Sequence, residues 1–257
     1  MEGTALETQS QEMGTMIPAP KASKLASVSP VLIERYSEAN VPTEYGTFRT
    51  VVYREHRTGL TSGHTYEEHV AMVMGDVRGE DVLVRVHSEC LTGEVMHSLK
   101  CDCREQLDRG LRVVAKAGRG VVMYLRQEGR GIGLGDKIRA YALQERGADT
   151  VDANRLLGLP DDARRYNVAA FMARDLGIES MQLLTNNPDK VRKLRAEGIV
   201  VHQRVPVYIE PNPHSVGYLL TKSRRMEHQL DIEGAQDNEG VIDAAVSADV
   251  SGDGSAE

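Results

Sequence analysis

Three short segments in the first third of the chain combine apolar and polar residues in a way that predicts β-strands. They span 46–54, 68–76 and 82–87, they are rich in Val, Tyr and Thr, and turn residues separate them. Such segments favour an antiparallel or mixed sheet, in which one face of each strand packs against the core. The last segment leads directly into a loop that contains cysteines.

The hydrophobic period changes after this loop. Leu107, Leu111 and Val114 recur at helical spacing and predict a helix over 104–117, and the apolar run 120–125 is typical of a buried strand. Further helices are expected at 134–146, 164–176 and 188–197, with strands at 181–185 and 199–205. The pattern predicts a mixed α/β fold, in which a β-rich front that bears the cysteines is joined to an α/β body.

The two ends of the chain differ from its middle in composition. Residues 1–28 are rich in Thr, Ser, Gln, Gly, Ala and Pro without a sustained period, which predicts a solvated, disordered extension. We expect this extension to cover 1–36, a folded domain to cover 37–230, and an acidic disordered tail to cover 231–257.

The charge of the chain is concentrated in this tail. It contains eight acidic residues and no Lys or Arg, so that removing it changes the formal charge from −7 to +1. The remainder has no basic stripe of the kind that nucleic-acid binders carry. No stretch approaches the ~18 continuous apolar residues of a membrane span, and the N-terminal residues show no basic region followed by an apolar block, so we do not expect secretion. We therefore expect a cytoplasmic protein that binds neither nucleic acid nor membrane.

All three cysteines of the chain, Cys90, Cys101 and Cys103, lie in one short window. Three thiolates without a clear fourth protein ligand indicate a catalytic zinc site that keeps one position open for water. His87 or His97 could instead complete a structural Cys3His site, and clustered cysteines also occur as small core residues. A disulfide framework fits least, because an odd number of neighbouring cysteines would cross-link almost nothing.

Two further motifs combine a strand end with groups that suit an anion. Segment 124–133 enters a glycine-rich turn whose backbone N–H groups could approach phosphate oxygens, while Arg126 and Arg130 add charge. Segment 185–190 joins a threonine, a helix start and a lysine. A tight strand-to-helix connection would explain the first motif, and ordinary helix capping would explain most of the second.

Two motifs are less specific. Acidic residues precede a helix start with arginines at 161–166, and such acids commonly serve as caps or dipole partners. The tyrosine within 139–143 could be a packed core residue.

Several of these segments occur together in the order and spacing of one known family. They are RVHSECLTGE, SLKCDC, YLRQEGRGIGL, KIRAYALQ, the DxxR at 161–164, LLTNNPDK and QRVPV, spread over about 37–230. In combination they resemble GTP cyclohydrolase II. The resemblance implies that family's fold and hydrolytic opening of the GTP imidazole ring, the first step of riboflavin biosynthesis. Formate and pyrophosphate would be released, leaving 2,5-diamino-6-(5-phosphoribosylamino)pyrimidin-4-one.

The resemblance also implies ligands for a metal and for GTP. Cys90, Cys101 and Cys103 match the residues that bind one zinc ion per chain, and Mg2+ is expected with the triphosphate. The positions that match GTP contacts are Arg85, Val86, His87, Ser88, Glu89, Gln106, Glu128, Gly129, Arg130, Thr150, Thr185 and Lys190. The family further implies a homodimer.

Three residues match the family's catalytic positions. Tyr141 matches the tyrosine beside the reacting base, Asp162 the proton acceptor, and Arg164 the nucleophile toward the α-phosphate. A covalent arginine is chemically unusual, because its guanidinium has a very high pKa. A charge clamp on the leaving pyrophosphate would need an arginine at the same place.

Two other classes remain to be distinguished. A zinc-dependent nucleobase deaminase also combines cysteine-bound zinc with a glutamate, but the chain lacks its paired H-x-E and P-C-x-x-C signature. A noncatalytic, zinc-stabilised nucleotide-binding module would fit the cysteines and the glycine turn, yet it gives no reason for Tyr141 or Arg164. Formate release separates all three classes. An enzyme of a specialised deazapurine or flavin-like pathway would carry the same motifs.

Overall fold

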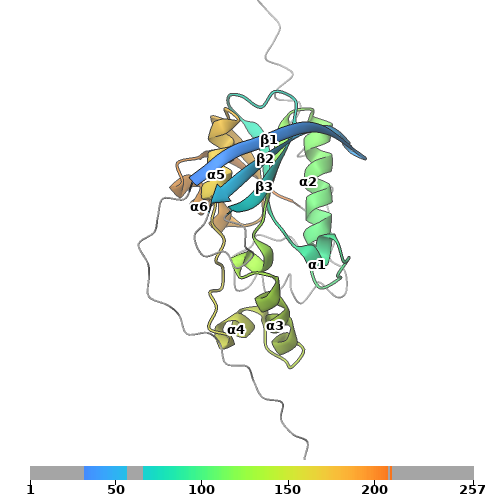
Figure 1. The fold of residues 1–257 in the computed structure, drawn as a ribbon, viewed down its shortest axis with the longest axis vertical. Coiled ribbons are helices and arrows are strands. Elements are labelled where there is room, and N and C mark those ends of the chain that lie inside the picture. The colour runs from blue at the N-terminus through green and yellow to red at the C-terminus, as the bar shows by residue number, and fades with distance from the viewer. Residues whose placement is uncertain (1–31, 57–65, 208, 210–257) are drawn as a thin grey trace, which may run out of the picture. The chain divides into compact units, whose positions relative to one another are not determined.

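One mixed β-sheet organises the part of the chain that the computed structural model describes, residues 32–56, 66–207 and 209. Its seven strands follow the order β1-β2-β3-β5-β4-β6-β7 (Figure 1). The strands are β1 (Leu32–Thr43), β2 (Gly46–His56), β3 (Tyr66–Met74), β4 (Val82–Ser88), β5 (Gly120–Leu125), β6 (Ser180–Leu184) and β7 (Val200–Val205). The helices are α1 (Leu91–Glu94), α2 (Cys103–Ala117), the 3-10 helix η1 (Glu128–Gly131), α3 (Leu134–Gln144), α4 (Thr150–Leu156), α5 (Asn167–Asp175) and α6 (Pro188–Ala196).

Strand β5 joins the antiparallel and parallel halves of this sheet. It pairs antiparallel with β3, where Val70 lies opposite Tyr124, and β2 and β1 continue the antiparallel half. It pairs parallel with β4, where Val86 lies opposite Met123, and β6 and β7 continue the parallel half. The predicted β-rich front and α/β body are therefore two halves of one sheet. The predicted mixed α/β class is confirmed.

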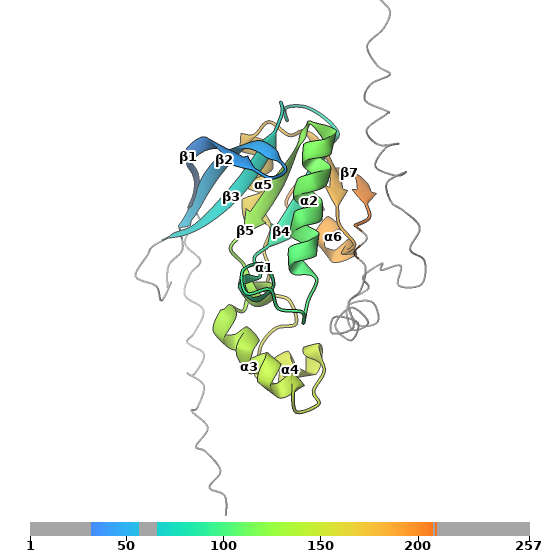
Figure 2. The same ribbon diagram turned by 90° about the vertical axis from the view of Figure 1, so that its right-hand side faces the viewer.

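Helices cover both faces of the sheet. Along β5, Val121, Met123 and Leu125 belong to the core beneath α5, whereas Val122 packs with α2 on the opposite face. Figure 2 shows α2 and α5 on the two sides of the strands. Because successive strand residues point to opposite faces, a strand covered on both sides is a continuous apolar run. This is why 120–125 could be predicted from sequence.

The carboxyl ends of the parallel strands meet at one edge of the sheet. β4 ends at Ser88, β5 at Leu125 and β6 at Leu184, and α3 and α4 lie beyond this edge (Figures 1 and 2). Ligand sites of open α/β sheets form at such an edge, because the loops that follow the strands converge there. The cysteine loop, the glycine-rich turn and the threonine motif are the loops that follow these three strands.

All the predicted helices and strands occur, with ends displaced by at most three residues. Four elements were missed, namely β1, α1, η1 and α4. β1 pairs only with β2 at the sheet edge and its side chains are mostly exposed, so it lacks the alternation that marks a half-buried strand. Its first residues fall in the stretch assigned to the extension. Residues 1–31 and the tail 231–257 lie outside the described residues.

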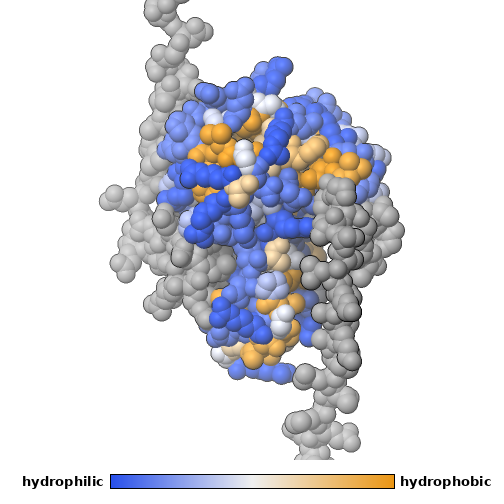
Figure 3. Space-filling view, turned by 90° about the vertical axis from the view of Figure 1, so that its left-hand side faces the viewer, coloured by the Kyte–Doolittle hydropathy of each residue, from blue (hydrophilic) through white to orange (hydrophobic). Residues whose placement is uncertain are grey.

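Hydrophobic side chains reach the surface in separate groups among hydrophilic ones, as one face shows in Figure 3. Within the described residues the large exposed hydrophobic side chains are Leu32, Tyr36, Val41, Val95, Met96, Leu99, Ile138, Leu156 and Val200. Among these residues, no helix has both the length and the apolar composition that crossing a bilayer requires.

The sheet core supplies a stability prediction. Leu183 of β6 is fully buried in the core that α5 covers, whereas Leu156 of α4 is 71% exposed. We expect Leu183→Ala to lower the free energy of unfolding by about 2–5 kcal/mol, because it removes buried methyl groups and leaves a cavity. Leu156→Ala, the same chemical change at the surface, should stay within about 0.5 kcal/mol. Urea denaturation measures both, and equal effects would contradict the assigned packing.

Candidate active site

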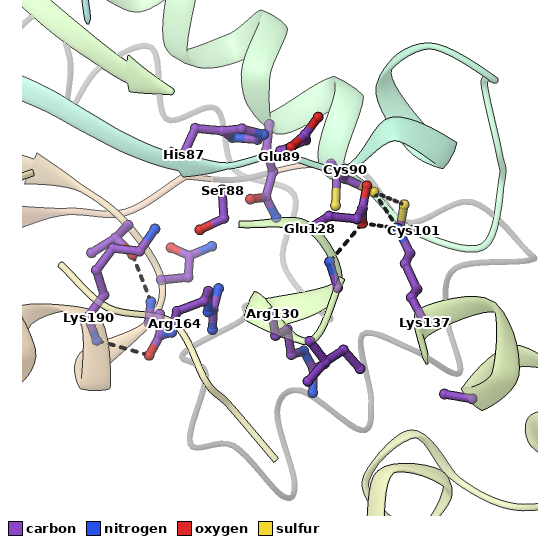
Figure 4. Close-up of a pocket in the computed structure, with 18 of the residues that line it drawn as sticks. His87, Ser88, Glu89, Cys90, Cys101, Glu128, Arg130, Lys137, Arg164 and Lys190 are labelled. Carbon is purple, nitrogen blue, oxygen red and sulfur yellow. Dashed lines mark hydrogen bonds and ion pairs between the residues drawn. The ribbon is translucent and has the colours of Figure 1, made fainter. Parts of the chain in front are cut away.

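A pocket lies where β4, β5 and β6 end. Figure 4 shows Cys90, Cys101 and Lys137 at one end of it, with Arg164 and Lys190 toward the other. Most of the site residues predicted from sequence line this pocket. They are Arg85, His87, Ser88, Glu89, Cys90, Cys101, Cys103, Gln106, Glu128, Gly129, Arg130, Tyr141, Arg164, Thr185 and Lys190.

Three predicted residues do not line the pocket. The side chain of Val86 is buried in the sheet core, and Asp162 contacts the pocket residue Arg164. Thr150 begins α4, and its side chain lies outside the described part of the structure. Polar residues that the sequence analysis did not assign also line the pocket, namely Lys137, Gln144, Asn154, Asn186 and Asn187. Asn154 could not have been found, because its helix was not predicted.

The three cysteines converge although they come from different elements. Cys90 precedes α1, Cys103 begins α2, and Cys101 lies in the connection between them. The Sγ atoms of Cys90 and Cys101 are 3.6 Å apart, and all three sulfur atoms lie within 4.8 Å of one another. A tetrahedral zinc ion with Zn–S bonds of ~2.3 Å separates its sulfur ligands by ~3.8 Å. The sulfur spacing therefore fits zinc.

Gly93 of α1 leaves room for this sulfur cluster. A Cβ atom at this position would lie 2.8 Å from Cys101 Sγ and 3.2 Å from Cys90 Sγ. The φ angle of Gly93 is not positive, so its backbone would accept another residue. Crowding by the sulfur atoms is thus the reason for a glycine here.

Neither candidate histidine completes the cluster. His87 Nε2 lies 2.6 Å from Glu94 Oε1, and burial lowers the pKa of this imidazole. His97 contacts the guanidinium group of Arg104 through Nδ1. Among the described residues, only the three cysteines supply ligand atoms to this cluster. A tetrahedral ion bound here would keep one position open, as catalytic zinc sites do.

Lys137 of α3 brings a buried positive charge to the cluster. Its Nζ lies 3.1 Å from Cys90 Sγ, 2.8 Å from Thr92 Oγ1 and 2.8 Å from Glu128 Oε1. Lys137 stands four residues before Tyr141, so both face the same side of the helix. This spacing, and the place of Lys137 at the start of the segment KIRAYALQ, were sequence signals that could have placed it in the site.

The cluster also favours the thiolate form of Cys90. The pKa of this thiol is lowered, first by hydrogen bonds from the thiols of Cys101 and Cys103 and further by the ammonium group of Lys137. A thiolate is the form of cysteine that binds metal.

The glycine-rich turn after β5 allows two backbone segments to touch. Gly131 has a φ of 88°, and a Cβ there would lie 2.9 Å from the carbonyl carbon of Ala163. Ala163 N donates a hydrogen bond of 3.0 Å to Arg130 O. Arg126, which we expected to add charge for an anion, instead donates to Glu89 at 2.7 Å.

Gln127 fastens the same two segments with its side chain. Its Nε2 donates to Arg165 O at 2.8 Å, and Arg165 N donates to its Oε1 at 2.8 Å. Gln127 is buried, so these hydrogen bonds do not compete with bulk water. They also explain why the predicted helix over 164–176 begins only at Asn167, because the backbone of Arg165 pairs outside the helix.

Arg164 and Asp162 form a two-point ion pair. Arg164 Nη2 donates to Asp162 Oδ2 at 2.6 Å, and its Nε donates to Oδ1 at 3.0 Å. Burial raises the pKa of Asp162, but the hydrogen bonds and charge of Arg164 outweigh it, so that the pKa is lowered from its ordinary value. In this arrangement Asp162 orients the guanidinium group toward the pocket, and it is a weak base.

In the threonine motif, segment 185–190, one residue caps the helix and another carries the positive charge. Asn187 accepts hydrogen bonds from Asp189 N and Lys190 N, so the expected capping of this helix is confirmed. Lys190 is buried and donates to Val86 O at 2.5 Å. Val86 therefore reaches the site region through its backbone carbonyl.

Arg85 ties three elements together beneath the pocket. It is buried, and it donates to Leu184 O at 2.9 Å and to Gln106 Oε1 at 2.5 Å. Gln106 Nε2 in turn donates to Asp102 Oδ2 at 2.6 Å. β4, β6 and the start of α2 are thereby held in register.

A second group of potential metal ligands comprises Glu55, Glu67 and His69, far from the cysteines in sequence. His69 Nδ1 accepts a hydrogen bond from Arg126 N at 3.0 Å, so only Nε2 of this ring faces the two carboxylates. That Nε2 lies 3.6 Å from Glu55 Oε2. Glu55 also accepts a hydrogen bond from Asn167 Nδ2 at 3.1 Å, so this group lies in its own polar cluster, separate from the cysteines.

Comparison with known proteins places the chain in a family. The GTP cyclohydrolase II family profile matches residues 34–206. GTP cyclohydrolase-2 of Actinobacillus succinogenes is 50% identical over 199 residues, which make up 77% of this chain and 88% of that protein.

Two proteins named riboflavin biosynthesis protein RibBA are also similar to this chain. The protein of Salinispora arenicola is 51% identical over 224 residues, or 86% of this chain and 50% of that protein. The protein of Aquifex aeolicus is 49% identical over 201 residues, or 77% of this chain and 48% of that protein. The chain thus spans about half the length of these RibBA proteins. On the family profile and the identity to the Actinobacillus protein, the chain belongs to the GTP cyclohydrolase II family.

Proposed function

We propose that this chain is a zinc-dependent GTP cyclohydrolase II. It opens the imidazole ring of GTP, releases formate and pyrophosphate, and forms 2,5-diamino-6-(5-phosphoribosylamino)pyrimidin-4-one, the first step of riboflavin biosynthesis. The observation that carries the proposal is one pocket with three cysteines at one end and Arg164 and Lys190 toward the other. GTP likewise has a base to be hydrolysed at one end and an anionic triphosphate at the other.

Zinc fits the cysteine residues at the end of the pocket that would receive the guanine base. The sulfur spacing, the space beside Gly93 and the thiolate character of Cys90 all support one zinc ion per chain. When bound, a zinc ion with an open coordination position acidifies water and so supplies a nucleophile near neutral pH. The surrounding residues then hold the base in place and move protons.

Tyr141 lines the pocket on the helix that carries Lys137. Ring opening needs two hydrolyses, one at C8 of guanine and a second that removes the formyl group left on nitrogen. The phenolic hydroxyl of Tyr141 can donate a hydrogen bond to the formyl oxygen while negative charge develops there. We assign Tyr141 chiefly to this second step.

Arg164 acts at the triphosphate end. Its guanidinium group, oriented by Asp162, binds the α-phosphate and stabilises the charge of the leaving pyrophosphate. Because the ion pair lowers the pKa of Asp162, this carboxylate accepts a proton only after Arg164 has turned toward the phosphate. We favour the clamp over a covalent arginine, since a guanidinium group is a poor nucleophile.

Other parts of the proposal rest on the family resemblance. The remaining GTP contacts come from the predicted residues that line the pocket, and Mg2+ accompanies the triphosphate. The protein works as a homodimer in the cytoplasm.

The proposal is tested by incubating purified protein with GTP while formate, pyrophosphate and the ultraviolet spectrum of the product are followed together. Stoichiometric formate and pyrophosphate support it. A nucleobase deaminase would release ammonia instead, and a noncatalytic module would release nothing.

The first prediction from the proposed function concerns the space for zinc. We expect Gly93→Ala to weaken zinc binding on the order of 10–100-fold, the usual range when residues beside the ligands are changed, because its methyl group would enter the sulfur cluster. In the control Gly135→Ala, the added Cβ meets no atom within 4 Å, so zinc should be retained. Metal analysis after dialysis against a chelator measures both. Tight zinc in Gly93→Ala would refute the assigned geometry.

The second prediction concerns Arg164. We expect Arg164→Ala to slow pyrophosphate release by about 10²–10³-fold, the range for removing one charge-stabilising donor. Its neighbour Arg165, whose side chain is 50% exposed, is the control, and Arg165→Ala should keep most of the rate. Wild-type rates in Arg164→Ala would rule out both roles. A guanylyl adduct in quenched wild-type reactions would establish the covalent role instead of the clamp.

The third prediction concerns Tyr141. We expect Tyr141→Phe to slow removal of the formyl group by about 10²–10³-fold while C8 attack continues, because the lost donor serves the second hydrolysis. A formamidopyrimidine nucleotide should accumulate, and chromatography would detect it. Tyr36→Phe, at an exposed tyrosine of β1, should accumulate none. Equal slowing of both steps would make Tyr141 a packing residue.

A further inference from the structure

Lys137 is unusual for a lysine in both its burial and its partners. It is 9% exposed, whereas lysines are almost never fully buried unless they are paired. Its ammonium group has three hydrogens, and the structure offers an acceptor for each, one of which is the sulfur of Cys90. Figure 4 shows the side chain reaching from α3 to the cysteines.

The ion pair with Glu128 does not by itself explain this placement. The Glu128 carboxylate already accepts hydrogen bonds from Leu91 N at 2.6 Å and from Gly129 N at 2.8 Å. A cation that served only Glu128 could point its remaining hydrogens to solvent. Lys137 directs them to Cys90 Sγ and Thr92 Oγ1 instead, on the loop that holds the cysteines.

Charge balance gives a physical reason for the contact between Lys137 and Cys90. Three thiolates and one Zn2+ carry a net charge of −1, which is costly to bury unless a positive charge lies close by. The Lys137 ammonium is a cation in direct contact with a sulfur atom of this cluster. Charges interact strongly at such a distance when water is excluded, and far less at the surface.

We propose that Lys137 is a positioning residue that retains zinc by balancing the charge of the thiolates. The inference rests on the proposed zinc function and deepens it. Through Glu128, Lys137 also fastens α3 and the glycine-rich turn to α1, since Glu128 accepts a hydrogen bond from Leu91 N of that helix. The charge that holds the metal and the contacts that shape the pocket are thus provided by one side chain.

Zinc retention tests the proposal directly. Competition with a chromogenic chelator measures the affinity of each protein for zinc. We expect Lys137→Met to bind zinc about 10–100-fold more weakly than the wild type, whereas Lys137→Arg, which keeps the charge, should lose much less affinity. Lys100 provides a matched control. It precedes Cys101 in the chain, but its ammonium lies 3.0 Å from Glu145 and its side chain is 45% exposed. Lys100→Met should therefore retain zinc as the wild type does.

Cobalt substitution provides a readout that a general loss of stability would not produce. A positive charge beside a thiolate lowers the energy of its lone pair, so removing it should move the sulfur-to-cobalt charge-transfer band to longer wavelength. We expect this shift in Lys137→Met and not in Lys137→Arg or Lys100→Met. If Lys137→Met does not fold, Lys137→Gln keeps a donor for Glu128 without the charge and should show the same shift.

A double variant separates the two partners of Lys137. If the lysine acts on the thiolates, Lys137→Met with Glu128→Gln should still lose zinc faster than Glu128→Gln alone. Equal zinc retention in these two proteins would show that Lys137 only neutralises Glu128, and would overturn the inference. Equal retention in Lys137→Met and wild type would also overturn it. A wild-type protein without zinc would instead contradict the proposed function, so the two failures can be told apart.

Discussion

The parallel pairing of β4 with β5 and β6 is the constraint on which the site depends. It brings the ends of three strands to one edge, so that the cysteine loop, the glycine-rich turn and the threonine motif face a common pocket. On its other side β5 pairs antiparallel with β3, and the same sheet therefore continues away from the pocket. The three motifs are far apart in the sequence, and the parallel pairing is what brings them together.

Buried polar side chains then fix the loops relative to one another. Gln127 pairs with the backbone of Arg165, Arg85 connects β6 to α2, and Lys137 joins α3 to α1. Each makes hydrogen bonds away from bulk water, where an unmet bond would be costly. Loops held in this way keep their hydrogen-bond donors oriented before a ligand binds. Such preorganised donors stabilise charge that develops in a transition state.

Electrostatics divides the pocket into two ends with different chemistry. At one end, three cysteine sulfur atoms suit a divalent cation, and the Lys137 ammonium lies against Cys90. At the other, Arg164 is oriented by Asp162 and Lys190 is held by the carbonyl of Val86. Lys137 also pairs with Glu128, so that buried charged groups at both ends have oppositely charged partners.

The sequence by itself determined most of the secondary structure and the chemistry of the motifs. Hydrophobic periodicity reports local burial, and the spacing of Cys90, Cys101 and Cys103 already indicated zinc with an open position. Edge strand β1 was missed because its side chains are mostly exposed.

Only the tertiary structure decided which residues act together. In it His87 contacts Glu94 and His97 contacts Arg104 rather than the cysteine cluster, and Lys137 contacts Cys90. These contacts depend on how helices and loops pack against the sheet. A side chain's partner distant in sequence leaves no local periodic signal, so the pattern along the chain could not predict it.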